Sequence, residues 1–414
     1  MHRLWQNLKA VKSQTKTAVV GGGAAGFFVA VNLKEMVPEM DVTIFEKGER
    51  VLRKVELSGG GRCNCTNSFE DVRDLSAVYP RGHRLLKRLF MTFDYRDAYS
   101  WFEQHGVKLV TQDDHCVFPA AQDAHAIINC FLELARRQHI IICTRTKVLS
   151  LEQLKDYDFI VVTTGGSPKG EGLRWLADSG HDIAAPVPSL FTLRIDDGQL
   201  TALTGTVVND VTASIPGTKH RACGPLLITH WGLSGPAVLK LSSYAARQLA
   251  EQDYRQPLSI NWVQQDEASV QASLYETGIR QPQKQLTTFN PFGLPQRLWA
   301  YLAGKAVNRP ARWGELNKKE VNRLTNTLTN DTYQTAGRAP FKDEFVTCGG
   351  ISLASINPST LESRSVPHLY FAGEVLDIDG ITGGFNFQAA WTTAYVAAKS
   401  IASNCGTSPP GKDS

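Results

Sequence analysis

Glycines are grouped at three places in the sequence, and the first group has the spacing that binds a nucleotide. The first group, Gly21-Gly22-Gly23-Ala24-Ala25-Gly26, follows the short apolar run of residues 17–20. Gly21 would allow a tight turn, Gly23 would let the backbone approach a diphosphate, and Gly26 would let the next helix lie close to the strand. The first N–H groups of such a helix carry a partial positive charge that attracts phosphate. The pattern predicts a dinucleotide site.

An acidic residue stands where a dinucleotide site needs one. Glu46 follows Gly26 by twenty residues, within the alternating run of residues 41–47. A carboxylate at this place accepts hydrogen bonds from a ribose and disfavours the additional phosphate of NADP. Strand, glycine turn, helix and second strand within about 30 residues predict one βαβ unit. From this motif alone NAD remains open as the ligand, and a ligand-free glycine turn is the weaker alternative.

The second group is the segment Ser58-Gly59-Gly60-Gly61-Arg62-Cys63-Asn64-Cys65-Thr66-Asn67. Three consecutive glycines lose much conformational freedom on folding, so a closely approaching ligand or an unusual backbone is a reasonable explanation. Arg62 could face an anion, while Ser58 and Asn64 could bond to a polar cofactor. A flexible loop with a solvated arginine is the alternative. A disulfide between Cys63 and Cys65 would be strained, so we expect packing or loop cysteines.

The third group lies in residues 373–388, GEVLDIDGITGGFNFQ. Gly384, Phe385 and Asn386 are predicted to lie at the start of the last long helix. The N–H groups at that helix end could face N1 and the C2 carbonyl of a flavin and stabilise the anionic reduced ring. Glu374 could position a ribityl chain or phosphates. The segment therefore predicts a second helix start at the same cofactor.

Three titratable residues could take part in catalysis. Asp377 and Asp379 are predicted to be solvated or turn-forming, with catalysis the less favoured alternative. His230 lies in Thr229-His230-Trp231-Gly232-Leu233-Ser234-Gly235-Pro236, which follows an apolar strand and opens a helix. A structural role is favoured there over general acid–base catalysis. His230 is nevertheless the one catalytic candidate that the sequence offers.

The composition limits the kinds of partner and the cellular location that we expect. The 414 residues are 42% hydrophobic and 20% charged, and 44 basic against 40 acidic side chains give a net charge of +4. That balance is too weak to indicate nucleic acid or a membrane surface as a partner. No apolar run approaches the roughly 20 residues that span a bilayer. The eight cysteines form no CxxC pair, and we expect a reducing, cytoplasmic location.

Together the motifs resemble those of the BaiN-type flavoproteins, a group that includes aminoacetone-oxidase-like enzymes. The resemblance rests on GGGAAG, SGGGRCNCTN, THWGLSGP and GEVLDIDGITGGFNFQAAW, in this order, and covers the chain from Thr17 to Ala402. It implies FAD in a glutathione-reductase-type, Rossmann-like α/β domain. It also implies an inserted domain made of a small β-barrel and a helical part.

The resemblance further implies which residues bind FAD. Residues at the diphosphate and adenosine end would be Gly21, Gly23, Ala24, Ala25, Gly26, Glu46, Lys47 and Val148, the last through its backbone. Residues on the flavin side would be Ser58, Gly61, Arg62, Cys63 and Asn64. Residues of the chain crossing near the cofactor would be Thr164, Gly165 and Gly166. Residues that close over the isoalloxazine would be Gly373, Glu374, Gly384, Phe385, Asn386 and Phe387.

The expected domain organisation follows from the resemblance and from breaks in composition. We expect a basic leader, an FAD-binding domain in two parts, an inserted domain between them and a disordered tail, at residues 1–16, 17–187 and 345–404, 188–344, and 405–414. The insert would consist of a barrel followed by a helical part, at residues 188–262 and 263–332.

The function expected from the sequence is that of an FAD-dependent oxidoreductase. It would act on a small organic substrate at the junction of the FAD domain and the insert, by amine oxidation or enone-type reduction. No second strand-linked GxGxxG occurs, so NAD(P)H would visit transiently, or substrate and oxygen would exchange electrons with FAD directly. No metal, nucleic acid or membrane partner is expected. The alternatives from other classes are an FAD-dependent RNA-modifying enzyme and a non-catalytic flavin or nucleotide sensor.

Overall fold

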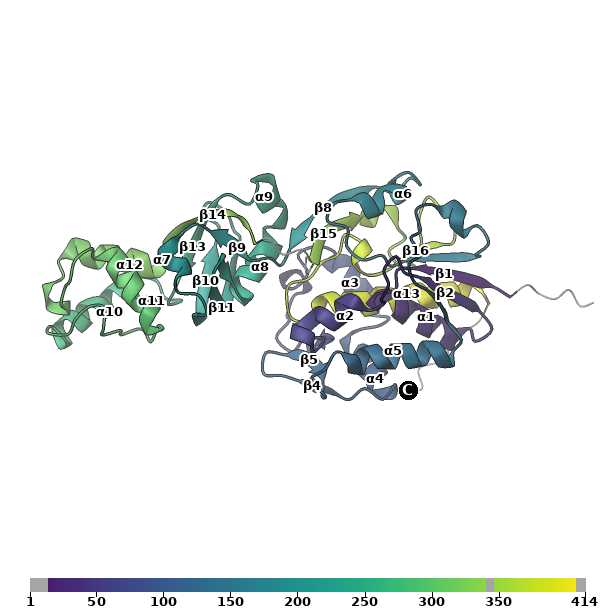
Figure 1. Ribbon diagram of the computed structural model, residues 1–414, viewed down its shortest axis with the longest axis horizontal. Coiled ribbons are helices and arrows are strands. Elements are labelled where there is room, and N and C mark those ends of the chain that lie inside the picture. Colours follow the sequence, from purple (N-terminus) through teal and green to yellow (C-terminus); the bar gives the residue numbers. More distant parts are fainter. Residues whose placement is uncertain (1–13, 340–345, 407–414) are drawn as a thin grey trace, which may run out of the picture. The chain divides into compact units, whose positions relative to one another are not determined.

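The computed structural model describes residues 14–339 and 346–406 and divides the chain into two compact units (Figure 1). The first unit comprises residues 1–186 and 347–414, and the second comprises residues 187–346. Each unit has a separate hydrophobic core. The divisions drawn from the sequence, after residues 187 and 344, lie one and two residues from these.

A five-stranded parallel sheet forms the centre of the first unit. Its order is β16-β7-β1-β2-β6, with bounds Leu369–Phe371, Phe159–Val162, Lys16–Val20, Asp41–Phe45 and Ile141–Cys143. The inner strands read as apolar runs because helices and loops cover both faces of such a sheet. The strand β16 comes from the last fifth of the chain, so both ends of the sequence build one sheet. All five carboxyl ends lie at the same edge, where open α/β sheets bind their ligands.

Two helices from opposite ends of the chain pack together beside this sheet. These are α1 (Ala24–Met36) and α13 (Phe385–Asn404), which lie side by side (Figure 1). An aromatic cluster holds them, since the Phe28 ring lies 4.6 Å from Trp101 and 5.1 Å from Trp391 between ring centroids. Such large buried rings contribute strongly to core stability. The packing brings the starts of both helices to the carboxyl edge of the sheet.

Shorter elements complete the first unit. Its other helices are α2 (Arg53–Leu57), α3 (His83–Leu89), α4 (Tyr95–Gln104), α5 (His125–Arg137) and α6 (Arg174–Ala177). A three-stranded sheet has the order β3-β5-β4, with bounds Thr66–Asn67, Cys116–Pro119 and Leu109–Thr111. A two-stranded sheet pairs β15 (Val346–Ile351) with β8 (Ile183–Ser189). In the described part of the chain, no helix combines the length and hydropathy needed to cross a bilayer.

The second unit contains a closed six-stranded barrel. Its order is β10-β11-β12-β9-β14-β13, with bounds Val207–Ser214, Arg221–Thr229, Gly232–Ser234, Leu193–Ile195, Asp331–Arg338 and Pro257–Asn261. Three helices accompany it, α7 (Gly198–Thr201), α8 (Pro236–Tyr244) and α9 (Ala246–Glu251). Alternate residues of the strands point inward and form the core, as expected for a small filled barrel.

The barrel prediction for residues 188–262 was wrong in one respect. The strand β14 closes the barrel and follows the helical part, so the barrel does not end at residue 262 and the helical part ends before residue 331. Without β14, the edges of β9 and β13 would carry unpaired backbone groups. The sequence of β14, DTYQTAGR, is too polar to stand out as a core strand, although its inward positions are buried.

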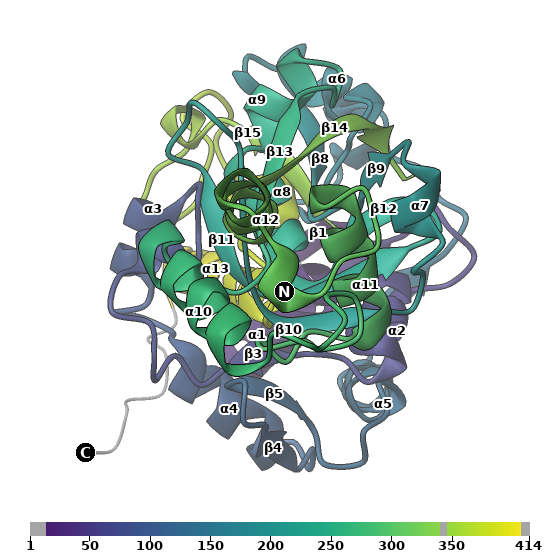
Figure 2. The same cartoon turned by 90° about the vertical axis from the view of Figure 1, so that its left-hand side faces the viewer.

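The helical part lies between β13 and β14. Its helices are α10 (Glu267–Arg280), α11 (Gln296–Ala306) and α12 (Lys318–Thr329), and α12 packs against both others (Figure 2). Trp299 and Trp313 stack in its core with ring centroids 6.1 Å apart and planes 12° apart. These two rings belong to the same hydrophobic core as the inward residues of the barrel, so the helical part is packed onto the barrel.

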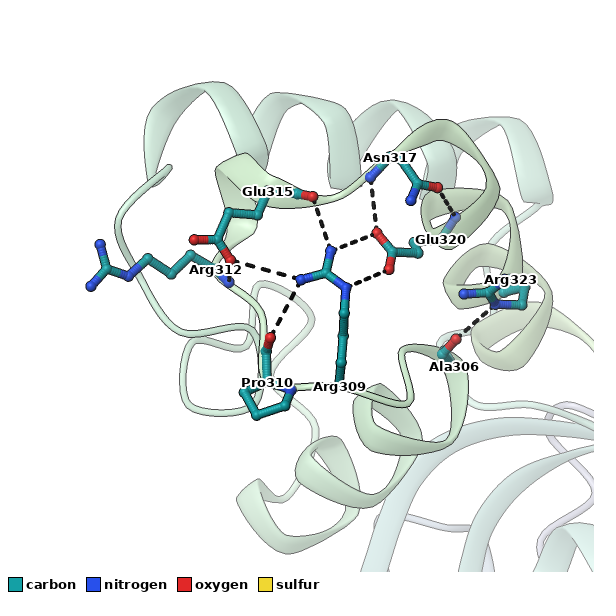
Figure 3. Close-up of polar contacts among 8 residues, drawn as sticks. All are labelled: Ala306, Arg309, Pro310, Arg312, Glu315, Asn317, Glu320 and Arg323. Carbon is teal, nitrogen blue, oxygen red and sulfur yellow. Dashed lines mark hydrogen bonds and ion pairs between the residues drawn. The ribbon is translucent and has the colours of Figure 1, made fainter.

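An arginine organises the loop that leads into α12 (Figure 3). Arg309 donates two hydrogen bonds to the Glu320 carboxylate, at 2.9 and 3.0 Å, and a third to the backbone oxygen of Glu315 at 3.1 Å. Glu320 is 5% exposed and forms a capping box with Asn317 at the start of α12. Charge-assisted, two-pronged hydrogen bonds of this kind fix geometry well.

Candidate cofactor site

Two of the glycines at the start of α1 are required by close backbone packing. Gly21 has φ +120°, and a Cβ atom there would lie 2.4 Å from the backbone oxygen of Thr163 at the end of β7. A Cβ atom on Gly26 would lie 2.0 Å from the backbone oxygen of Gly21. Real side chains cannot make such contacts, so glycine lets α1 begin directly against β1 and β7.

Gly23, which lies between Gly21 and Gly26, faces free space. Gly23 precedes the first helical residue, and a Cβ atom there would meet nothing within 4 Å. No acidic residue stands in the first turn of α1, which begins with Ala24 and Ala25. The helix therefore presents its unpaired N–H groups and positive end to an open volume that a side chain would fill. These residues fit a diphosphate.

The end of β2 carries the groups that are predicted to bind an adenosine. One carboxylate oxygen of Glu46 accepts from the Gly22 N–H at 2.9 Å, and the other accepts from the Gly48 N–H at 2.7 Å. Each oxygen keeps a lone pair for a ribose hydroxyl. Lys47 is exposed next to it, and the partly buried Val148 packs beneath β1 and β2. All lie at the carboxyl edge of the sheet.

The second glycine group forms an open turn. Gly59, Gly60 and Gly61 have φ values of +56°, +68° and +86° within the short 3-10 helix Ser58–Gly61. Side chains on Gly60 or Gly61 would meet nothing within 4 Å. Arg62 is partly exposed, and its guanidinium carbon lies 4.2 Å from the centre of the Phe118 ring. The turn thus leaves a bare backbone beside a cation, which suits a planar polar ligand.

The two neighbouring thiols lie in the core of the first unit. Cys63 and Cys65 are both fully buried and unpaired. Burial raises the pKa of the Cys63 thiol to about 12, an effect that a hydrogen bond with Ser58 only partly opposes. Both thiols are therefore protonated at neutral pH and unsuited to redox exchange. The predicted contact of Cys63 with the flavin would have to be made by its backbone.

The glycine that follows β16 lies against α1. A Cβ atom on Gly373 would lie 2.8 Å from the Cβ atom of Ala25, and the Gly373 N–H donates to Thr393 of α13 at 2.8 Å. The next residue, Glu374, accepts from the Thr347 N–H at 2.8 Å and pairs with Lys54 at 2.7 Å. This segment joins the start of α1, the helix α13 and the helix α2.

The chain crossing after β7 lies beside Glu374. A Cβ atom on Gly166 would lie 2.7 Å from a carboxylate oxygen of Glu374, and one on Gly165 would lie 3.7 Å from the other. Thr163, directly after β7, is buried and donates to Gly21 O at 2.9 Å, whereas the next residue, Thr164, is exposed. The crossing is thus placed between the first and third glycine groups.

The start of α13 is tied to the second glycine group. Gly384 has φ +88°, and a Cβ atom there would lie 2.1 Å from Thr66 O. The Asn64 side-chain amide accepts from the Gly384 N–H at 3.2 Å and donates to Thr66 O at 2.9 Å. Asn67 donates to Gly383 O at 3.0 Å. Two segments more than 300 residues apart in sequence therefore form one surface.

The last predicted residues have different surroundings. Phe385 is buried, and Phe387 is partly exposed and stacks on Trp391 with ring centroids 5.5 Å apart. The side chain of Asn386 bonds to both backbone groups of Gly380, accepting at 2.8 Å and donating at 2.9 Å. Asn386 thus shapes the preceding loop, and the start of α13 offers mainly backbone groups to a ligand.

The candidate catalytic histidine belongs to the second unit. His230 is exposed in the turn between β11 and β12, with its ring centroid 5.0 Å from that of Trp231. Thr229 Oγ1 accepts from the Trp231 and Gly232 N–H groups and stabilises this turn. As predicted, the segment follows a strand and precedes a helix, α8. A catalytic role for His230 stays a prediction.

The acids of the third segment differ from each other. Asp377 is partly exposed, whereas Asp379 is fully buried and pairs with Arg81. Asp379 is therefore not solvated, which was one of the two roles that the sequence favoured, and its pairing with Arg81 argues against a catalytic role. Sequence reasoning also missed Arg81 and Lys54, because their partners lie 298 and 320 residues away. In the described ranges, no three His, Cys, Asp or Glu side chains are grouped so as to hold a metal ion.

The sequence pattern of the HI0933-like protein Rossmann domain matches residues 15–400. The chain belongs to this family. The resemblance to BaiN-type flavoproteins is thereby confirmed, with its Rossmann-type FAD-binding fold. This HI0933-like protein binds FAD and is a flavin-dependent oxidoreductase.

Curated relatives match over nearly their full length. The 3-dehydro-bile acid delta(4,6)-reductase of Clostridium scindens is 26% identical over 412 residues, covering 94% of this chain and 99% of the relative. The ribosomal RNA dihydrouridine synthase of Haemophilus influenzae is 28% identical over 416 residues, covering 94% and 98%. That of Escherichia coli is 27% identical over 414 residues, covering 92% and 97%.

Solved flavoenzymes resemble the chain more distantly. The 3-ketosteroid delta1-dehydrogenase of Sterolibacterium denitrificans is 11% identical with a TM-score of 0.49, covering 94% of this chain and all of that one. A flavocytochrome c3 fumarate reductase is 16% identical with a TM-score of 0.47, covering 95% and 78%.

Proposed function

We propose that this oxidoreductase reduces a carbon–carbon double bond conjugated to a carbonyl group in a small organic substrate. The support is the full-length likeness to relatives whose names share this chemistry. A delta(4,6)-reductase of 3-dehydro-bile acids saturates double bonds conjugated to a ketone. A dihydrouridine synthase saturates the ring double bond of uracil, which is conjugated to a carbonyl. Of the two reactions expected from the sequence, this likeness favours enone-type reduction over amine oxidation.

Bound FAD would supply the two-electron redox chemistry. In the net reaction the double bond gains two electrons and two protons. NAD(P)H, as the visiting donor, would supply both electrons and one proton on oxidation to NAD(P)⁺, and water would supply the second proton. The sequence has a single strand-linked GxGxxG, so a donor site separate from the flavin is not expected.

Different residues of the chain would bind different parts of the cofactor. The start of α1 at Gly23 would bind the diphosphate, and Glu46 would accept from the ribose. Glu374 and Lys54 would face the middle of the cofactor, and the turn at residues 58–61 with the start of α13 would face the ring. Because α13 is 20 residues long and has no acid in its first turn, its positive end would stabilise negative charge on the reduced ring. The conjugated carbonyl polarises the double bond, which makes this the bond most easily reduced.

Anaerobic flavin spectroscopy tests the proposal. The flavin of the holoprotein is reduced with NADPH, NADH or dithionite and then mixed with pairs of unsaturated ketones and their saturated analogues. We expect unsaturated ketones to restore the oxidised flavin spectrum and to yield the saturated product, while the saturated analogues leave the flavin reduced. A protein whose oxidised flavin is bleached by amines, and whose reduced flavin ignores every unsaturated ketone, would contradict the proposal.

A second candidate substrate is uracil within RNA. Two relatives are named as ribosomal RNA dihydrouridine synthases, and the charge of the chain is unevenly distributed. Residues 187–346 hold 17 Lys and Arg against 13 Asp and Glu, whereas the rest of the chain holds 27 of each. A net positive charge attracts phosphate backbones. In the same anaerobic assay, reoxidation by a ribosomal RNA transcript with formation of dihydrouridine, without response to small ketones, would select this candidate.

We also propose a cytoplasmic location. None of the eight cysteines, all within the described residues, forms a disulfide, and four of them are buried. Cysteines that form no disulfide are typical of a reducing compartment. The predicted binding of substrate at the junction of the FAD domain and the insert stays a prediction.

A further inference from the structure

A buried ion pair fixes the loop that leads into α13. Arg81 precedes α3, and Asp379 lies in the loop of residues 377–384. The Arg81 Nε donates to Asp379 Oδ1 at 2.5 Å, and Nη2 pairs with Oδ2. The Asp379 side chain is fully buried and that of Arg81 is 13% exposed. The backbones of the same two residues also pair as an isolated antiparallel bridge.

Neighbouring residues extend this contact along the loop. The Ile381 N–H donates to Val78 O at 2.9 Å, and the hydroxyl of the buried Tyr79 donates to Phe385 O at 2.8 Å. Gly82, with φ +78°, lies so close to Ile378 that a Cβ atom would be 2.6 Å from its side chain. Residues 78–82 therefore form a scaffold against which the loop of residues 377–384 packs.

The same loop also contacts the second glycine group of the candidate site. Asn67 holds Gly383 and Asn64 holds Gly384, both from the second glycine group. The loop is thus fixed between the scaffold of residues 78–82 and the segment that would contact the flavin. A shift at Asp379 would be passed over a few residues to the first N–H groups of α13.

We propose that Arg81 is a positioning residue for FAD. Arg81 holds Asp379 in place, so that residues 383–385 present their backbone to the isoalloxazine. The inference rests on the placement of the ring at the start of α13 that was proposed above. It does not depend on the identity of the substrate.

The choice of an ion pair at this place supports a positioning role. Moving two charges out of water is unfavourable, and well-packed apolar residues often replace a buried pair without loss of stability. A two-pronged guanidinium–carboxylate contact instead specifies one geometry. Such specificity is needed where glycines, which restrict the backbone least, must hold a defined conformation.

Three variants of the holoprotein test the inference. Arg81→Met removes the charge, and Arg81→Lys keeps the charge but loses the two-pronged geometry. Lys305→Met is the matched control, because Lys305 pairs at 2.6 Å with Asp331, which is 3% exposed, in the second unit. The measurements are the Kd for FAD by fluorescence titration, the flavin reduction potential, the flavin absorption spectrum and the melting temperature.

We expect both Arg81 variants to raise the Kd for FAD by about tenfold or more and to shift the reduction potential, with Arg81→Lys the milder. Lys305→Met should lower the melting temperature and leave the Kd and the potential unchanged. Wild-type affinity and potential in Arg81→Lys and Arg81→Met would overturn the inference.

A further variant covers poor folding of Arg81→Met. Tyr79→Phe removes only the hydroxyl that bonds to Phe385 O, and it should produce a smaller shift of potential in the same direction as Arg81→Lys. An unchanged potential in Tyr79→Phe and Arg81→Lys would overturn the inference by itself. Because none of these measurements uses a substrate, failure of the proposed ketone reduction would leave their outcome intact.

Discussion

The glycines of the cofactor site separate into two kinds according to what a side chain would meet. At Gly21, Gly26 and Gly384 a Cβ atom would lie 2.0–2.4 Å from a backbone oxygen of the same chain. At Gly23, Gly60 and Gly61 it would meet nothing within 4 Å. The fold requires the first kind. The second kind leaves free space, which the proposed FAD site would use.

This distinction gives a prediction for Gly23→Val. The substitution should leave the unfolding of the FAD-free protein nearly unchanged, because the native φ of −93° and the open surroundings accept a side chain. It should raise the Kd for FAD by at least about tenfold, since the valine would occupy the diphosphate position. Fluorescence titration and thermal unfolding measure the two effects.

The control is Gly304→Val, at a helix position of the second unit where a Cβ atom also meets nothing within 4 Å. It should leave the Kd for FAD unchanged. Full FAD affinity in Gly23→Val would contradict the assigned role of the first glycine group.

Single residues also show where sequence reasoning ends. The glycine groups could be predicted because their function lies in local spacing, within a few residues. Lys54, Tyr79 and Arg81 could not be predicted, because each acts on a partner about 300 residues away that only the folded chain brings near. The burial of the Cys63 thiol likewise depends on packing that its neighbours in sequence do not reveal.

At the scale of elements, local capping decides where helices begin. Residues 84–104 have apolar spacing suited to helices, and the structure has two helices there, α3 and α4, with Asp94 between them. Asp94 and Asp97 form a capping box, which satisfies the first N–H groups of α4 and favours a new start there. The same device starts α12, where Asn317 and Glu320 form the box and Arg309 binds Glu320.

The Glu320 contacts predict a pH dependence for the helical part. Hydrogen bonds from Arg309 and from the Asn317 backbone lower the Glu320 pKa below its ordinary value of 4.5. Because the folded pKa is depressed, the stabilisation is present above pH 4.5 and is lost as the pH falls through the folded pKa. Denaturant unfolding of the second unit should therefore show falling stability below pH 4.5.

Glu320→Gln should unfold more readily at pH 7 and lose less stability on acidification than the wild type. The control is Glu267→Gln, an exposed residue in the first turn of α10. Parallel pH profiles for the wild type and Glu320→Gln would refute the role given to this pair.

The whole molecule consists of two units with separate cores. All three glycine groups of the candidate cofactor site, including the one at the start of α13, belong to the first unit. The sequence could indicate this organisation because the pattern of the dinucleotide fold gives way to alternating strands near residue 187 and returns near residue 345. It could not indicate that the barrel is completed after the helical part, since a polar strand such as β14 is defined by its partners.

Removal of FAD should therefore affect the two units differently. A ligand stabilises only the unit that it binds, by an amount that grows with its concentration relative to Kd. Scanning calorimetry of the holoprotein and of FAD-free protein should show one transition that falls by several degrees and another that stays in place. Equal shifts of all transitions would show that the units unfold together, contrary to their separate cores.

The order of strands in the barrel has a consequence for how this protein can diversify. The helical part leaves the barrel after β13 and returns at β14, and these two strands are paired neighbours, with Ile260 opposite Asp331. Its entry and exit are thus one hairpin apart. An ordinary tight turn could join the same two strands. Evolution can therefore lengthen, shorten or replace the segment between them without changing the barrel or the unit that binds the nucleotide.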